Sequence, residues 1–171
     1  MRVICEGHKM EIEIDAVKSF LPHRDPFLFV DGVKEIILSE ESKGKDELEM
    51  KDLIGSTVVG LYKTKKEHPI FEGHFPGNPI LPGVVQIEMM AQVSSFALMK
   101  AVPNWRDMKM DVMLLSVNSS KFRKPVFPEM ELEIHTKCTK IRGPFMTNEC
   151  VVYHNGEAMS EASVMASVKF V

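Results

Sequence analysis

Residues 71–92 read FEGHFPGNPILPGVVQIEMMAQ and carry the strongest structural signal in the chain. Its first half holds six Gly and Pro residues within the eleven positions 73–83, which excludes a helix or a central strand there. From Val84 to Met99 there is no Gly or Pro and most residues are apolar, so we predict one long buried helix. The sequence therefore predicts a rigid loop that leads into a central helix.

Two ionisable residues stand out in this stretch, His74 in the loop and Glu88 one turn inside the helix. Apolar neighbours surround Glu88, so we expect burial to raise the pKa of its carboxyl group and let it hold a proton near neutral pH. Glu88, Gln92 and Ser95 follow the spacing i, i+4, i+7 and share one helix face. This polar stripe is either the solvated side of an amphipathic helix or a functional group. Glu88 is the only charge between His74 and Lys100, which is unlike a solvated face.

His74 also has two interpretations. It is either a surface histidine with an ordinary hydrogen bond or a side chain held in place by a loop that Pro and Gly have made rigid. A base that works near neutral pH and a tuned acid are what proton transfer beside a carbonyl group requires.

Three motifs resemble those of the FabZ-type (3R)-hydroxyacyl-[acyl-carrier-protein] dehydratases. They are HFPGNPILPGV at 74–84 with Glu88 fourteen residues after His74 and MAQ at 90–92, LPHRDPFL at 21–28, and KFRKPV at 121–126. They occur in the family's order and cover the chain from residue 14 to its end. The resemblance implies an α+β hotdog fold, in which an antiparallel sheet wraps around one long central helix. One apolar helix among about six antiparallel strands is consistent with that arrangement.

The resemblance implies that His74 is the catalytic base and Glu88 the catalytic acid. The reaction would remove water from a (3R)-hydroxyacyl thioester and give a trans-2-enoyl product, with no metal and no other cofactor. The backbone N–H groups of Gly83 and Val84 open the helix at the positive end of its dipole, so we expect them to stabilise the thioester oxygen. Gln92, one turn after Glu88, is expected to orient that carboxyl group.

An apolar tunnel must hold the acyl chain of such a substrate. The candidate lining residues are Phe75, Met89, Met90, Phe96, Leu98 and 113–115, with Met113 the first choice on that strand. Plain core packing is the other interpretation of each of them.

The implied partner is an acyl carrier protein that presents the hydroxyacyl group on phosphopantetheine. Because that carrier is acidic, we expect a docking patch formed by Arg24, Lys121, Arg123 and Lys124, although a solvated basic turn explains the last three equally well. Glu129 adds a negative charge beside the patch where family members commonly have Gly. The resemblance also implies a homodimer, or a trimer of such dimers, with each active site shared between two subunits.

Length and composition set wider bounds. A chain of 171 residues is expected to form a single domain, 1–171, in which 1–14 is an N-terminal extension. The 21 basic and 24 acidic residues give a formal charge of −3, which offers no reason to expect a nucleic acid partner. Cys5, Cys138 and Cys150 lack metal-site spacing and are interpreted as reduced thiols. With no signal peptide and no membrane span recognised, we expect a cytoplasmic protein.

The remaining elements follow from local patterns. We expect a hairpin over 2–14 with a strand at 10–14, and a short helix over 16–21 capped by Asp15. A polar loop is expected over 39–51. The predicted strands are 27–38 with a turn at 31–32, 56–63, 111–118, 130–141, 146–154 and 158–170. His135 and His154 alternate with apolar residues and are expected to face outward.

Three alternative functions remain open at this point. A hotdog thioesterase would keep the fold but use an activated water, and the His74 to Glu88 spacing with the Phe-Pro-Gly loop favours the dehydratase. A non-catalytic acyl-binding subunit would not need both catalytic positions, and both are filled. A dehydratase that also isomerises the double bond usually carries Asp as its acid, where this chain has Glu88.

Overall fold

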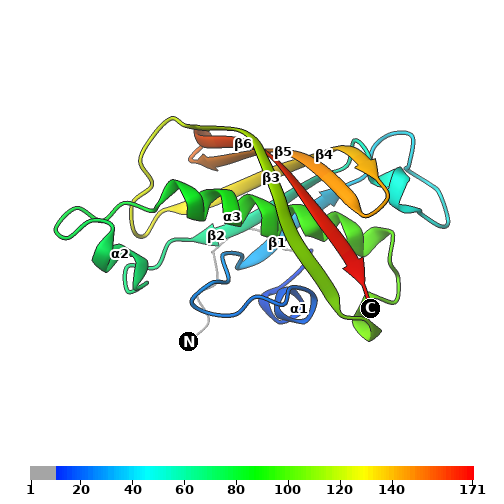
Figure 1. Cartoon of the computed structure of the whole chain (residues 1–171), viewed down its shortest axis with the longest axis horizontal. Helices are drawn as coiled ribbons and strands as arrows, with labels where there is room; N and C mark the ends of the chain where they lie inside the picture. The colour runs from blue at the N-terminus through cyan, green and yellow to red at the C-terminus, as the bar shows by residue number, and fades with distance from the viewer. Residues whose placement is uncertain (1–10) are drawn as a thin grey trace.

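One antiparallel sheet of six strands forms the body of the molecule, and a helix lies along one of its faces (Figure 1). We analysed a computed structural model of the chain, which describes residues 11–171. The strand order across the sheet is β1-β2-β4-β5-β6-β3. The elements are α1 Ile14–Phe20, β1 Gly32–Ile37, η1 Met50–Leu53, β2 Thr57–Lys63, α2 Ile70–Gly73, α3 Gly83–Ser94, η2 Ser95–Lys100, η3 Trp105–Asp107, β3 Met110–Phe122, β4 Glu131–Arg142, β5 Phe145–His154 and β6 Glu157–Phe170.

The predicted central helix is α3, which packs against β2, β4, β5 and β6. It begins directly after Pro82, whose φ of −57° suits the entry to a helix. The helical path continues through the predicted end at Met99 to Lys100, but from Ser95 onward it is the tighter 3₁₀ form. The hydroxyl groups of Ser94 and Ser95 donate back to the carbonyls of Met90 and Ala91, a contact that competes with regular α-helical bonding.

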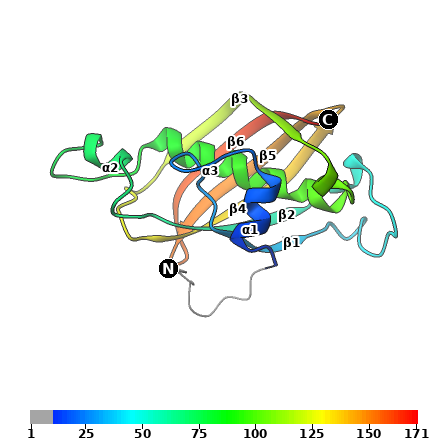
Figure 2. The ribbon, with the colours of Figure 1, turned by 90° about the horizontal axis from the view of Figure 1, so that it is seen from below.

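The core lies between α3 and the sheet. Met89, Met90, Val93, Phe96 and Leu98 are completely buried there. Figure 2 shows that α1 and the loop that follows it cross α3 on the side away from the sheet, so the helix is enclosed from both sides. The two cysteines of the described region, Cys138 and Cys150, are buried free thiols, and burial raises the pKa of Cys150 to about 12.

The N-terminal prediction was partly wrong. Ile14 already belongs to α1, and Ile12 makes only a single bridge to Val33, so no strand covers the described part of this segment, 11–14. Asp15 lies in the first turn of α1 and does not cap it, because the cap position is Glu13 and no side chain bonds there. The part of the predicted hairpin before residue 11, with Cys5, lies outside the described residues.

The strand predicted over 27–38 forms only from Gly32 to Ile37. The segment before it is a loop, because the backbone of Phe27 and Phe29 bonds to the side chain of Gln92 and not to a neighbouring strand. The other five predicted strands are confirmed as β2 to β6. β3 is longer than expected and reaches Phe122.

β3 forms one edge of the sheet and exposes apolar side chains there. Met113, Leu114, Leu115 and Val117 are each about two-fifths to one-half exposed. A long, apolar edge strand with unpaired backbone groups is suited to pairing with another strand. No helix in residues 11–171 is long and apolar enough to cross a membrane.

Gly60 of β2 sets how closely α3 approaches the sheet. A Cβ atom at this position would lie 2.5 Å from Cγ2 of Val93, so even alanine forces the helix and the sheet apart. We expect Gly60→Ala to lower the free energy of unfolding by about 1–3 kcal/mol, the usual cost of overpacking. Urea unfolding measures this, and Gly60→Ala combined with Val93→Ala should regain part of the loss. A single variant as stable as the wild type contradicts the close contact.

Candidate active site

The loop before α3 holds His74 in a defined orientation. The Ile80 N–H donates to the His74 carbonyl at 2.8 Å, and the His74 ring nitrogen Nδ1 lies 2.8 Å from the Ile80 carbonyl. A carbonyl oxygen can only accept, so Nδ1 must carry the hydrogen of this bond. In the neutral ring Nε2 then has a free lone pair, which is the form that a general base requires.

A cavity of about 490 Å³ opens beside His74. Its walls come from the loop, the first turns of α3 and the end of β3, namely Ile80, Leu81, Gly83, Val84, Gln86, Phe122, Arg123, Lys124 and Pro125. The first N–H groups of a helix have no partner within it and carry partial positive charge. Gly83 is needed at this position, because a Cβ atom would lie 2.6 Å from the Phe122 ring.

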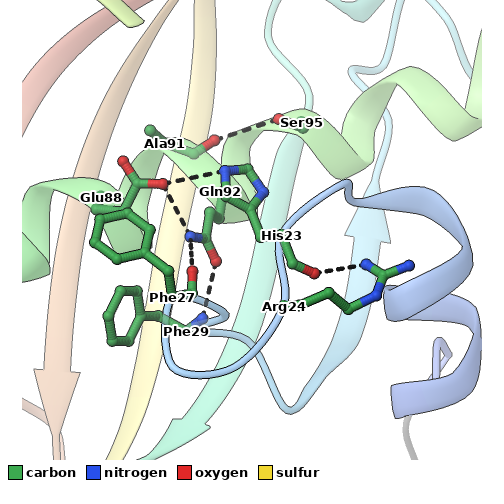
Figure 3. A network of polar contacts seen from close by, with 8 residues as sticks. All are labelled: His23, Arg24, Phe27, Phe29, Glu88, Ala91, Gln92 and Ser95. Carbon is green, nitrogen blue, oxygen red and sulfur yellow. Dashed lines mark hydrogen bonds and ion pairs between the residues drawn. The ribbon is translucent and has the colours of Figure 1, made fainter. Parts of the chain in front are cut away.

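Glu88 belongs to a second polar group, drawn in Figure 3. Its Oε1 atom accepts a hydrogen bond from Nε2 of Gln92 at 2.9 Å and lies 3.3 Å from Nε2 of His23. Gln92 is 2% exposed, and its amide also donates to the Phe27 carbonyl and accepts from the Phe29 N–H, both at 2.9 Å. One side chain therefore orients the carboxyl group of Glu88 and fixes the loop in front of it.

The pKa expected for Glu88 was wrong in direction. The hydrogen bond with His23 lowers the pKa of Glu88, and the bond from Gln92 and the charge of His23 lower it further. Burial raises it, as expected from the apolar neighbours, but the three lowering contributions together exceed it. The side chain is 21% exposed, so the desolvation of the carboxyl group is incomplete. Glu88 is therefore ionised near neutral pH in the chain without substrate.

Among residues 11–171, no hydrogen bond or ion pair joins His74 to Glu88. The cavity beside His74 does not include Glu88, whose nearest polar partners are His23 and Gln92. The two residues that the sequence singled out thus lie in separate polar environments of one chain.

The expected substrate-binding residues have different surroundings. Gly83 and Val84 line the cavity, and Phe75 stacks on the His74 ring with the centroids 4.0 Å apart. Met113 is 51% exposed on β3, away from the core. The other tunnel candidates on the helical segment, Met89, Met90, Phe96 and Leu98, are core residues.

The expected docking residues are partly engaged within the chain. Arg123 forms a two-pronged ion pair with Glu161, and Lys124 pairs with Glu157 at 2.8 Å. Nη1 of Arg24 donates to the carbonyls of Leu21 and His23. Lys121 is exposed, and no carboxylate in the described region pairs with it. His135 and His154 are both partly exposed, and neither lines the cavity beside His74.

Sequence reasoning missed two residues. His23 belongs to the quoted motif LPHRDPFL but received no role, since the contact with Glu88 spans 65 positions in sequence. Gln86 is 3% exposed, lines the cavity and has an Oε1 atom without a partner. The sequence signal for Gln86 was the presence of a polar glutamine on the apolar side of the helix. No group of three or more His, Cys, Asp and Glu side chains that could hold a metal ion occurs within residues 11–171.

Sequence comparison with known proteins identifies related dehydratases. A family model for ApeI-like dehydratases matches residues 52–162. The 3-hydroxyacyl-[acyl-carrier-protein] dehydratase FabZ of Nitratiruptor sp. is 35% identical over 161 residues, which cover 92% of this chain and 97% of that protein. The bifunctional enzyme LpxC/FabZ of Chlorobaculum tepidum is 34% identical over 156 residues, which cover 91% of this chain but only 30% of that longer protein.

Among solved structures, the dehydratase heterocomplex ApeI:P from Xenorhabdus doucetiae is similar with a TM-score of 0.68 and 17% identity. The match covers 90% of each chain. At that identity the likeness shows the fold alone, and it confirms the hotdog arrangement expected from the sequence.

Gln92 is expected to matter for stability as well as for the site. Gln92→Leu leaves the buried Phe29 N–H and the partly buried Phe27 carbonyl without partners. We expect the free energy of unfolding to fall by roughly 1–3 kcal/mol, which is the cost of one unsatisfied buried group. Chemical denaturation tests this, with Gln86→Leu as a control that breaks only one long contact of 3.4 Å. Equal losses in the two variants contradict the role given to Gln92.

Proposed function

This chain belongs to the FabZ-type 3-hydroxyacyl-[acyl-carrier-protein] dehydratases, enzymes of fatty acid synthesis, and we propose that His74 and Glu88 carry out the reaction. The substrate is a (3R)-hydroxyacyl group held as a thioester on acyl carrier protein, and the product is the trans-2-enoyl thioester. The thioesterase and the non-catalytic subunit lose support, because relatives at least 30% identical over about nine-tenths of this chain are dehydratases.

His74 removes the proton on the carbon next to the thioester carbonyl. The observation that carries this proposal is the bond between Nδ1 and the Ile80 carbonyl, since it leaves Nε2 free to accept that proton. Negative charge then builds on the thioester oxygen. The N–H groups of Gly83 and Val84, at the start of α3 and on the wall of the same cavity, are the donors that stabilise it.

Glu88 protonates the hydroxyl group on the next carbon, and that group leaves as water. The carboxyl group must hold a proton at that moment, although it is ionised in the chain without substrate. An acyl chain that covers Glu88 excludes the remaining water, and this desolvation raises the pKa of the carboxyl group. The proton is thus taken up as the substrate binds.

We propose further that each site is formed by two chains in a homodimer, with His74 from one and Glu88 from the other. Two observations support this: the separate polar environments of the two residues, and the exposed apolar edge of β3. Pairing of β3 with the same strand of a second copy would bury 113–117 and extend the sheet. Such a two-fold interface creates two equivalent sites. A trimer of these dimers stays a prediction.

The docking surface that we propose for the carrier protein consists of Lys121, Arg123 and Lys124 at the end of β3, with Arg24. Arg123 and Lys124 support it because they line the cavity that also contains His74. Their ion pairs with Glu161 and Glu157 reduce the net charge, so Lys121 is the strongest candidate. The buried free thiols Cys138 and Cys150 support a cytoplasmic location, where thiols stay reduced.

Loss of either catalytic group should abolish dehydration while the fold persists. We expect Glu88→Gln and His74→Ala to lower kcat at least about 100-fold, the usual contribution of a general acid or base. Product formation from a hydroxyacyl carrier substrate measures this, with circular dichroism as the check on folding. Near wild-type turnover by folded Glu88→Gln would overturn the acid assignment.

Mixing these two inactive variants tests the shared site. After subunit exchange, a mixed dimer has one site with both substitutions and one site with neither. Random reassortment makes half of the dimers mixed, so roughly a quarter of all sites should regain wild-type activity. If exchange is confirmed by mass and the mixture stays inactive, His74 and Glu88 act within one chain.

Charge reversal should affect the carrier-bound substrate selectively. We expect Lys121→Glu with Lys124→Glu to raise KM for the carrier substrate much more than for a small thioester, since only the carrier is acidic and large enough to reach the patch. The control is Lys43→Glu with Lys51→Glu, two lysines that pair with Glu40 and Glu49. Their segment, 43–51, lies at the opposite end of the molecule from the connection between β3 and β4 (Figures 1 and 2). Equal effects on both substrates would remove the docking proposal.

A further inference from the structure

The two oxygens of Glu88 have different surroundings. Nε2 of Gln92 and Nε2 of His23 both approach Oε1, at 2.9 and 3.3 Å (Figure 3). Within residues 11–171, no hydrogen bond is donated to Oε2. A carboxyl group fixed in this way has one oxygen held by the protein and one oxygen available to a bound molecule.

The imidazole of His23 lies against this carboxyl group, with Nε2 3.3 Å from Oε1. Carboxylate oxygens only accept, so Nε2 of His23 can contribute to this contact only as an N–H group. Nδ1 of His23 is buried and has no partner in the described region. Nε2 is thus the ring nitrogen of His23 that meets a polar partner.

The backbone around His23 is fixed as well. The N–H of Leu21 donates to the Val17 carbonyl at the end of α1, and Leu21 is 1% exposed. The guanidinium of Arg24 bonds to the carbonyls of Leu21 and His23 at 2.9 and 2.6 Å. His23 therefore reaches Glu88 from an anchored turn, and its side chain is 24% exposed.

We propose that His23 is a positioning residue for Glu88: with Gln92 it occupies Oε1, so that Oε2 carries the proton for the departing hydroxyl group. This inference rests on the acid role of Glu88 proposed above. The C–O bond breaks with its electron pair on the hydroxyl oxygen, which takes the proton from Oε2 and leaves as water. The negative charge left on Glu88 is then stabilised by the two N–H groups at Oε1.

Few other charges bear on this carboxyl group. Arg24 is bonded to backbone carbonyls, and the charge of Asp25 acts on Asp31 and Tyr62. Nε2 of His68 bonds to the Pro26 carbonyl of the same loop. Of the ionisable groups in residues 11–171, only His23 shifts the pKa of Glu88, with its hydrogen bond as the largest cause.

The test compares His23→Phe, which has no donor, with His23→Gln, whose amide can replace Nε2. Infrared titration follows the Glu88 carboxyl band, isolated as the difference between each protein and its Glu88→Gln counterpart. We expect the titration midpoint to rise in His23→Phe and to return toward the wild-type value in His23→Gln. We expect kcat to fall about 10- to 100-fold in His23→Phe with little change in KM, and His23→Gln to recover most of it.

His68→Gln is the matched control, because it removes another imidazole bonded to the same loop without touching Glu88. It should leave the Glu88 midpoint in place. If His23→Phe does not fold, His23→Ala with added imidazole replaces it, and imidazole should restore turnover. A loss of kcat that is equal in His23→Phe and His23→Gln, with an unmoved midpoint, would show a purely structural role and overturn the proposal.

The outcome also separates this inference from the proposed function. Inactive Glu88→Gln together with a fully active His23→Phe would leave the acid role intact and refute only the positioning role. Active Glu88→Gln would refute the acid role itself.

Discussion

The hydrogen bonds of the Gln92 amide hold the central helix, the loop in front of it and Glu88 together. This amide is one of the most buried polar groups in the described region, and each of its polar atoms has a partner. Its oxygen accepts from the Phe29 N–H, and its nitrogen donates to the Phe27 carbonyl and to Glu88. This single side chain joins the central helix to the loop in front of it and orients the proposed acid. A buried amide with all its bonds made is rigid, because any rotation would leave several groups unsatisfied.

His74 is also held in a fixed orientation, but by hydrogen bonds within its own loop. Its loop is closed by backbone bonds between His74 and Ile80 and between Phe75 and Asn78, so its orientation does not depend on α3. The proposed base and the proposed acid are thus held by separate sets of contacts. In the shared-site proposal the two residues come from different chains, and the apolar edge of β3 offers a surface for pairing them.

Local pattern was sufficient to predict most of the fold. The Pro and Gly cluster before residue 84 and the apolar run after it predicted α3, and alternating residues between clear turns predicted β4 to β6. The predictions failed where a distant side chain determines the local backbone. Gln92 binds the backbone of 27–29, which therefore cannot join β1. Within the helical segment, back-bonding by Ser94 and Ser95 is consistent with the change to the 3₁₀ form after residue 94.

Contacts between distant residues also limited what could be predicted about the site. The positions of His74, Glu88 and Gln92 could be read from spacing, and the contact of Gln92 with Glu88 is confirmed. The pKa of Glu88 could not be predicted, because it depends on His23, a residue from a distant loop whose approach no local pattern indicates. Burial alone predicts a raised pKa, and only the three-dimensional partners reverse the direction.

The most direct measurement is a crystal structure of the protein with an unreactive 3-hydroxyacyl amide in place of the thioester. We expect the hydroxyl oxygen of the ligand to lie within about 3.2 Å of Oε2 of Glu88, while Oε1 stays on Gln92 and His23. We also expect Nε2 of the partner's His74 to lie about 3–3.5 Å from the carbon that loses its proton. A ligand bound between His74 and Glu88 of the same chain, or a hydroxyl group on Oε1, would contradict the proposed mechanism.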